Sequence, residues 1–394
     1  MLLSIGLILI VGMTLGWLCK KIRLPALIGM LATGIILGPY VLNMFDSSIL
    51  GISSEIRKTA LIIILTRAGL SLDISGLKKI GRPAFLMCFL PATFELAGML
   101  LLGPKLLRLS LLESAIMGAV LAAVSPAVVV PRMVKLMEEG YGTKEGIPQL
   151  ILAGASVDDV FVIVLFTTFT GMAQGEGISV IKFVNIPVSI IAGIVIGILA
   201  GFLLSKFFEK VHIRDTVKIL IILSLSFILA ALEDMMTTVI TFSSLISIMF
   251  IGVALQKFRE PVAKRLSVKY NKLWVGAEVF LFVLVGATVN INYLGNVGIK
   301  ALIVILAALV FRMAGVFACL LGTGFNSKER IFTMMAYTPK ATVQAAIGGI
   351  PLALGLACGD TVLTVAVLAI VLTAPLGAFA IDASYRKLLK KSSK

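Results

Sequence analysis

The stretch SPAVVV, at Ser125–Val130, lies in the middle of an apolar run, and a related stretch, TPKATV, lies in a second such run at Thr338–Val343. Each places a proline directly after a hydroxyl residue. Proline removes a backbone N–H donor and clashes with the preceding turn, so helices break there. Broken backbone at membrane depth is tolerated only where it is buried in protein or lines a wet cavity. The two stretches therefore predict two discontinuous membrane helices, broken around Pro126, Pro131 and Pro339.

The composition places the whole chain in a membrane. Of its 394 residues, 59% are hydrophobic and only 14% are charged, which is too apolar for a water-soluble domain of this length. The first apolar run, Met1–Leu18, lacks a basic leader and a small-residue cleavage motif, so we expect it to be a span and not a removed signal peptide. Runs of spanning length predict an all-α polytopic membrane protein with about 13 transmembrane helices, centred near residues 10, 32, 64, 93, 122, 159, 197, 224, 247, 283, 310, 341 and 372.

The basic residues predict the orientation of these spans. Loops after odd-numbered spans, together with the C-terminal tail, hold 26 of the 35 Lys and Arg residues, and loops after even-numbered spans hold 6. Cytoplasmic loops carry the excess of Lys and Arg, so we expect the N-terminus outside and the C-terminus in the cytoplasm, in a plasma membrane or a bacterial inner membrane. The same distribution accounts for the net charge of +15 without a nucleic-acid partner, because the basic residues lie between apolar runs.

Three pairs of similar segments indicate an inverted repeat. They lie in the same order at offsets of 217, 213 and 218 residues: FELAG (94–98) with FRMAG (311–315), SPAVVV with TPKATV, and AGLSLD (68–73) with GATVNI (286–291). The offset equals seven spans, an odd number, so paired helices cross the membrane in opposite directions. Many secondary transporters are built in this way, with the substrate site between the halves. We expect one transporter unit over residues 1–394. It consists of a first repeat at 1–180, a connecting span at 181–212 and a second repeat at 213–394.

Five ionisable residues lie near the middle of predicted spans: Glu95, Asp158, Asp159, Arg312 and Lys340. Each unpaired charge would cost a few kcal/mol there, or on the order of 10 kcal/mol together, so they must contact each other or water. Glu95 and Arg312 occupy equivalent positions in the two repeats and predict an ion pair, for which a purely structural role is one interpretation. We expect Lys340, at a helix break, to neutralise Asp158.

Asp159 is then left to bind a cation or a proton. Adjacent helix positions lie about 100° apart, so Asp158 and Asp159 can face different partners. A small hard cation such as Na⁺ or Li⁺ prefers oxygen ligands. The candidates are the two carboxylates, the hydroxyl groups of Ser125 and Ser156, and the unwound carbonyl groups beside Ser125. Protonation of a carboxylate and cation binding to it would exclude each other.

These residues resemble the monovalent cation:proton antiporters, in particular the NhaA/NapA-like and NHA sodium/proton exchangers of the second cation:proton antiporter family. The resemblance covers nearly the whole chain and rests on ILTRAGLSLD, SPAVVVP, ASVDDV and TPKATVQAA. It implies an NhaA-like fold, a homodimer, and a mobile core domain that carries the ion by an elevator-like movement. By position, it implies that Asp159 is the ion and proton carrier, that Asp158 forms a salt bridge with Lys340, and that Glu95 and Arg312 form the additional pair of the NHA branch.

The sequence thus favours a sodium (lithium)/proton antiporter of pH homeostasis, which is not an enzyme and needs no cofactor. A potassium/proton exchanger on the same scaffold is the nearest alternative, because selectivity depends on ligand geometry. An intramembrane aspartyl protease would need two carboxylates that face each other from separate helices, and Asp158 and Asp159 are adjacent on one helix. A channel is less favoured, because a titratable carboxylate beside a lysine suits exclusive occupancy better than rapid conduction.

Overall fold

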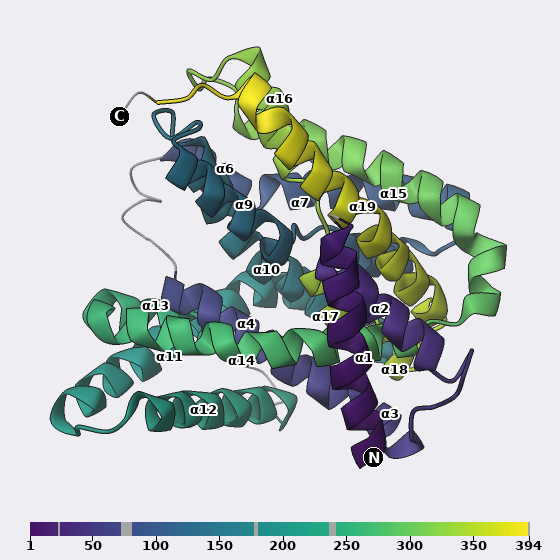
Figure 1. Cartoon of the computed structure of the whole chain (residues 1–394), viewed down its shortest axis with the longest axis horizontal. Helices are drawn as coiled ribbons and strands as arrows, with labels where there is room; N and C mark the ends of the chain where they lie inside the picture. The colour runs from purple at the N-terminus through teal and green to yellow at the C-terminus, as the bar shows by residue number, and fades with distance from the viewer. Residues whose placement is uncertain (23, 72–80, 177–179, 236–241, 393–394) are drawn as a thin grey trace. The chain divides into compact units, whose positions relative to one another are not determined.

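The structure, a computed structural model, describes residues 1–22, 24–71, 81–176, 180–235 and 242–392. Regular structure in these ranges is helical (Figure 1), apart from one isolated bridge between Tyr141 and Lys391. Nine stretches of helix in the described ranges are long and apolar enough to cross a membrane. Each of the predicted span centres falls in a helix or, at 122 and 341, between two helices. The predicted all-α polytopic fold is therefore confirmed.

The chain forms two compact units, each built from segments distant in sequence. The first comprises Met1–Ser54, Asp73–Gly175 and Leu281–Lys394, and the second comprises Glu55–Leu72 and Glu176–Phe280. The predicted repeats, at 1–180 and 213–394, are segments related by symmetry. A division into compact units does not test such a relation, so the repeats stay a prediction. The second unit contains most of α4 (Ser53–Ser71), α11 (Val180–Lys210), α12 (Asp215–Met235), α13 (Ser244–Phe258) and most of α14 (Glu260–Ala287).

The first unit holds the remaining helices. Those before the first break are α1 (Leu2–Lys21), α2 (Ala26–Leu37), α3 (Ser47–Gly51), α6 (Arg82–Met87), α7 (Leu90–Leu102), the π-helix η1 (Gly103–Leu107) and α8 (Leu111–Leu121). Those after it are α9 (Pro126–Glu139), α10 (Ile147–Gly171), the π-helix η2 (Met172–Glu176), α15 (Ile291–Cys319), α16 (Ser327–Ala336), α17 (Thr342–Ile347), α18 (Ile350–Ala353) and α19 (Gly359–Leu388).

In the second unit, small residues allow α11 and α13 to pack closely. Gly193, Gly197 and Gly201 recur every four residues and so lie on one face of α11. A Cβ atom on Gly193 would come within 2.8 Å of the Ser243 carbonyl oxygen, and one on Gly201 within 2.8 Å of the Ile251 carbonyl oxygen. A larger side chain at either position would therefore push the two backbones apart.

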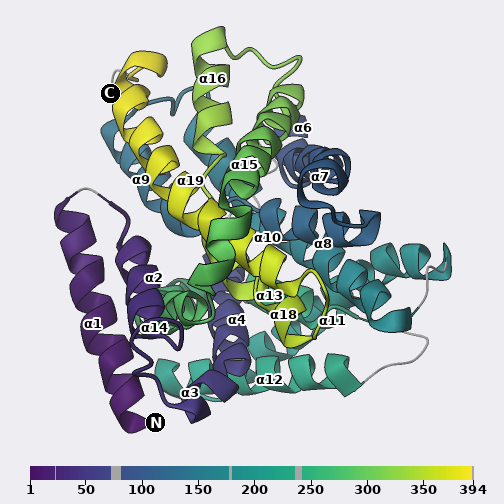
Figure 2. The same cartoon turned by 90° about the vertical axis from the view of Figure 1, so that its right-hand side faces the viewer.

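In the first unit, α7 and α15 pack against each other through the two segments of the repeat (Figure 2). A Cβ atom on Gly98 would lie 2.6 Å from Cγ of Phe311, and one on Gly315 would lie 3.0 Å from Cβ of Phe94. The glycine of each segment thus packs against the phenylalanine of the other segment. A two-fold relation between FELAG and FRMAG would produce this reciprocal contact, which supports the predicted inverted repeat.

We expect Gly315→Ala to destabilise the protein by about 1–3 kcal/mol, the usual cost of overpacking. The new methyl group would also meet backbone, because Cα of Pro91 lies 2.8 Å from its position and cannot give way by a rotamer change. The matched control is Gly6→Ala in α1, where nothing lies within 4 Å of the new atom. Thermal unfolding in detergent measures both variants. Equal melting temperatures would contradict the close approach of α7 and α15.

Two discontinuous helices cross in the first unit. α8 ends at Leu121 and α9 begins at Pro126, while α16 ends at Ala336 and α17 begins at Thr342. The two non-helical segments, 122–125 and 337–341, meet where the Ser125 amide donates a hydrogen bond to the Pro339 carbonyl oxygen, at 2.8 Å. Both predicted breaks are therefore present.

The two prolines of the first break behave differently. Pro126 is the first residue of α9, where its missing N–H group costs no helical bond. Pro131 lies inside α9, which continues to Glu139, so its prediction as a helix break is wrong. Its ring removes a single hydrogen bond near the start of the helix, and the later turns still form.

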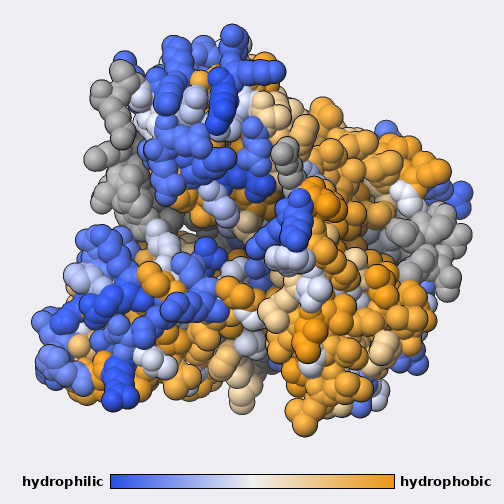
Figure 3. Space-filling view, viewed as in Figure 1, coloured by the Kyte–Doolittle hydropathy of each residue, from blue (hydrophilic) through white to orange (hydrophobic). Residues whose placement is uncertain are grey.

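The outer surface of the first unit is apolar along its long helices. Exposed large hydrophobic side chains include Leu2 and Ile10 on α1, Val310 on α15, and Leu376 and Phe379 on α19. In Figure 3, hydrophilic side chains gather instead over α16 and the end of α19. Apolar flanks with a polar end are expected of helices that cross a bilayer and end in water.

Candidate functional site

The five predicted mid-span charges are all buried in the first unit. Glu95, Asp158, Arg312 and Lys340 have no exposed surface, and Asp159 is 5% exposed. They come from α7, α10, α15 and the second helix break, which are far apart in sequence. Three carboxylates therefore accompany two basic groups. With every group ionised, these five side chains carry a net charge of −1.

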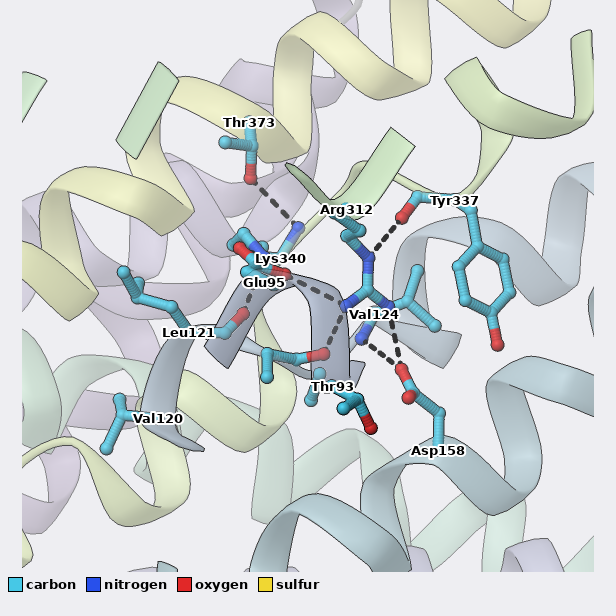
Figure 4. A network of polar contacts seen from close by, with 12 residues as sticks. Thr93, Glu95, Val120, Leu121, Val124, Asp158, Arg312, Tyr337, Lys340 and Thr373 are labelled. Carbon is cyan, nitrogen blue, oxygen red and sulfur yellow. Dashed lines mark hydrogen bonds and ion pairs between the residues drawn. The ribbon is translucent and has the colours of Figure 1, made fainter. Parts of the chain in front are cut away.

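The pairing within this cluster differs in part from the prediction (Figure 4). The Glu95–Arg312 ion pair is confirmed, with 3.0 Å between Oε2 and Nη1. The predicted Lys340–Asp158 pair is wrong, because Nζ of Lys340 lies 2.6 Å from Oε1 of Glu95. Asp158 instead contacts Arg312, with 2.7 Å between Oδ2 and Nη2. The planar guanidinium group carries five N–H donors, so Arg312 can serve two carboxylates at once.

Arg312 also joins the ends of the two half-helices. Its Nε donates to the Tyr337 carbonyl oxygen at 2.7 Å, and its Nη1 donates to the Ala122 carbonyl oxygen. Ala122 follows the last residue of α8 and Tyr337 follows the last residue of α16. The final carbonyl groups of a helix have no intrahelical donor and carry the negative end of the helix dipole. A buried cation at this point therefore stabilises both helix ends.

Two further side chains bind the last turn of α8. Lys340 donates from Nζ to the Leu121 carbonyl oxygen. Nε2 of Gln344 lies within hydrogen-bond distance of the carbonyl oxygens of Val120, Leu121 and Ala123, at 3.1, 3.3 and 3.0 Å. The four carbonyl groups at 120–123 thus have donors from the protein. Because a carbonyl oxygen has two lone pairs, these contacts do not test whether the unwound carbonyl groups beside Ser125 serve as cation ligands, and that expectation stays a prediction.

The two aspartates of α10 differ in the hydrogen bonds that their carboxylates accept. Oδ2 of Asp158 accepts a hydrogen bond from the Val124 amide, at 3.0 Å, which ties α10 to the first helix break. Within the part of the chain that the structure describes, Oδ1 of Asp158, Oδ1 of Asp159 and Oγ of Ser125 are buried without a hydrogen-bond partner. Buried polar atoms without partners are rare, and each needs an explanation. The side chain of Ser156 lies outside the described residues.

These oxygen atoms suit a weakly held cation. Carboxylate and hydroxyl oxygens are the ligands that hard cations prefer. Across the described side chains, no group of three or more His, Cys, Asp or Glu could hold a metal ion. The acidic pair, Asp158 and Asp159, would therefore need hydroxyl oxygens such as that of Ser125, or water, to complete a coordination shell.

Sequence reasoning missed two residues of this site. Gln344 could have been found, because it is a polar side chain in the apolar stretch TVQAAIGG, close to the second break. Tyr337 left no such signal, since it contributes its backbone carbonyl group and a ring that lies 5.0 Å from the Arg312 guanidinium carbon.

An all-α polytopic fold with two crossing discontinuous helices and an unbalanced buried charge cluster defines a secondary transporter of ions. Comparison with known proteins names the family: residues 6–383 match the family described as "Sodium/hydrogen exchanger, transmembrane". The chain belongs to this sodium/hydrogen exchanger family. It is an integral multi-pass membrane protein and a transporter, not an enzyme.

Individual relatives agree with this assignment. The chain is 34% identical to human sodium/hydrogen exchanger 9B2 over 389 residues, which cover 93% of this chain and 70% of that protein. It is 32% identical to human sodium/hydrogen exchanger 9B1 over 385 residues, which cover 93% and 73%. The structure of the sodium proton antiporter MjNhaP1 from Methanocaldococcus jannaschii at pH 8 superposes with a TM-score of 0.86 at 21% identity, covering 98% of this chain and 97% of that one. This last likeness confirms the fold.

Proposed function

We propose that the protein exchanges Na⁺, or Li⁺, for H⁺ across the membrane by alternating access, and that Asp159 binds either ion in turn. One observation carries the proposal: Asp159 is buried beside the charge cluster, and its Oδ1 has no hydrogen-bond partner among the residues that the structure describes. Membership of the sodium/hydrogen exchanger family and the names of the 9B1 and 9B2 relatives support the choice of ions.

The charge balance explains why the two ions would compete. Glu95 and Asp158 both contact Arg312, and Glu95 also contacts Lys340, so two basic groups offset two carboxylates. Asp159 is the surplus negative charge. An uncompensated buried charge costs several kcal/mol, and either one proton or one monovalent cation removes it. Binding of both would leave a surplus positive charge, so each ion displaces the other.

The cation would be held by oxygen atoms around Asp159. We propose Asp159 and Asp158 as the acidic ligands, with the hydroxyl groups of Ser125 and Ser156 as neutral ones. The partnerless Oδ1 of Asp158 and Oγ of Ser125 support this set. Potassium remains the alternative ion, because the same ligands in a wider arrangement would favour the larger cation.

The wider mechanism follows from the resemblance to NhaA/NapA-like and NHA exchangers. We propose a homodimer, an elevator-like movement of a core domain, a role in pH homeostasis, and a plasma membrane or bacterial inner membrane location. The N-terminus would lie outside and the C-terminus in the cytoplasm, as the basic loops favour. Accessibility of an added C-terminal epitope in intact and permeabilised cells tests the orientation, and labelling of intact cells would contradict it.

Collapse of an imposed pH gradient in proteoliposomes tests the exchange itself. We expect Na⁺ and Li⁺ to dissipate the gradient, because either can displace the proton from a compact oxygen site. Choline is the matched control, since it adds ionic strength without fitting the site. Dissipation by K⁺ alone would favour the alternative exchanger. A gradient that survives all three alkali cations, with folded protein in the vesicles, would rule out the proposed function.

A further inference from the structure

Gln344 lies at the ion site without carrying a charge. It is 1% exposed and belongs to the first turn of α17, directly after the second helix break. Its amide nitrogen faces the carbonyl oxygens of Val120, Leu121 and Ala123 at the end of α8. One side chain of the second discontinuous helix thus holds the end of the first.

One of these contacts leads directly to the acidic pair. The Ala123 carbonyl group and the Val124 amide group are the two ends of a single peptide unit. Gln344 donates to the carbonyl oxygen at 3.0 Å, and the N–H group donates to Oδ2 of Asp158 at 3.0 Å. A peptide unit is planar, so holding its oxygen fixes the direction of its N–H bond. Hydrogen bonds in such a chain also polarise and strengthen one another.

We propose that Gln344 is a positioning residue for the ion site, which orients the Ala123–Val124 peptide and, through it, the Asp158 carboxylate. The inference rests on the proposed function, because it concerns the site at which Na⁺ would bind. A fixed Oδ2 also fixes the place of Oδ1 in the same carboxylate, which has no hydrogen-bond partner among the described residues. Without Gln344, the peptide can turn and the carboxylate loses the hydrogen bond from Val124, so that only its contact with Arg312 still orients it.

The neutrality of Gln344 matters as much as its donors. Arg312 and Lys340 bind the neighbouring carbonyl groups of Ala122 and Leu121, but each also contacts carboxylates. A third basic side chain at position 344 would supply donors and would cancel the surplus charge of the cluster. Gln344 satisfies the carbonyl groups and preserves the negative charge that attracts a cation.

The first test is Gln344→Met, which keeps the length of the side chain and removes its donors. We expect the Na⁺ concentration for half-maximal exchange to rise about ten-fold, because a less well oriented Asp158 carboxylate binds Na⁺ less tightly, and a loss of about 1.4 kcal/mol in binding is ten-fold. The maximal rate at saturating Na⁺ should change much less, because Asp159 is intact. Gln256→Met, at a half-buried glutamine of α13 outside the site, is the matched control and should leave both values unchanged.

Hydrogen–deuterium exchange measures the positioning without any transport. In Gln344→Met, the peptide that covers 120–126 should exchange faster than in wild type, while segments of α19 keep their protection. Gln344→Lys keeps N–H donors at this position but adds a positive charge. The peptide that covers 120–126 should therefore stay protected, while the Na⁺ concentration for half-maximal exchange should still rise about ten-fold or more. Because this variant brings the cluster to neutrality, it is expected to fold even if Gln344→Met does not.

Several outcomes would overturn the inference. An unchanged Na⁺ half-saturation in folded Gln344→Met would do so, as would unchanged protection of 120–126. In Gln344→Lys, an unchanged Na⁺ half-saturation would show that the neutral side chain has no special role. If wild type itself shows no Na⁺-dependent exchange of protons, the proposed function fails, while hydrogen–deuterium exchange still reports whether Gln344 holds the peptide.

Discussion

Asp159→Asn should abolish Na⁺-driven collapse of a pH gradient in proteoliposomes. The substitution keeps the size of the side chain and removes the surplus negative charge of the cluster. A buried charge and its partner typically contribute about 2–5 kcal/mol or more, so loss of the charge corresponds to a decrease of about 30-fold or greater in exchange at low Na⁺. The variant should remain folded, because the Oδ1 that it alters has no partner among the described residues.

The control for this variant is Asp382→Asn. Asp382 is an aspartate of α19 whose side chain is 46% exposed and pairs with Arg132 at the surface. Its loss should leave exchange unchanged. Wild-type rates in Asp159→Asn would show that Asp159 is not the carrier. Asp158 would then be the next candidate, and the Asp159 carboxylate would have to be explained by structure.

Arg312→Met should lower the free energy of unfolding by about 3–5 kcal/mol, the usual cost of removing one partner from a buried ion pair. The loss is expected at the upper end of this range, because Arg312 contacts two carboxylates and two helix-terminal carbonyl groups. Only Lys340 would remain to offset three acidic groups. Thermal unfolding in detergent measures the effect, and exchange activity should fall together with the folded fraction.

A second variant tests whether charge imbalance causes this loss. In Glu95→Gln with Arg312→Met, one carboxylate is neutralised as well, so part of the stability should return and the two effects should not add. Arg132→Met is the matched control: its pair with Asp382 is half exposed and should contribute at most about 1 kcal/mol. If Arg312→Met unfolds no earlier than Arg132→Met, the cluster is not held together by this guanidinium group.

The sequence by itself determined the class of fold and the location of the site. Apolar runs predict spans because insertion of a helix into a membrane depends on the hydrophobicity of one continuous segment. The predicted centres fall in helices or at helix breaks. Pro126 and Pro339 mark the breaks because proline acts on its own turn of backbone. The Glu95–Arg312 pair was predictable because FELAG and FRMAG match in sequence, and the predicted two-fold axis between them would bring these equivalent residues together. The charge surplus at Asp158 and Asp159 can likewise be counted from the sequence.

Only the tertiary structure decided which group contacts which. Lys340 reaches Glu95 and not Asp158, since the choice depends on the rotation and depth of α7 and α10 and on the path of the second helix break, which no local rule specifies. Arg312 serves two carboxylates because the fold brings Glu95 of α7 and Asp158 of α10 to different nitrogen atoms of one guanidinium group. The tertiary structure also supplies the donors of Gln344 to the end of α8. Such contacts join residues more than 150 positions apart in sequence, and packing alone sets their geometry.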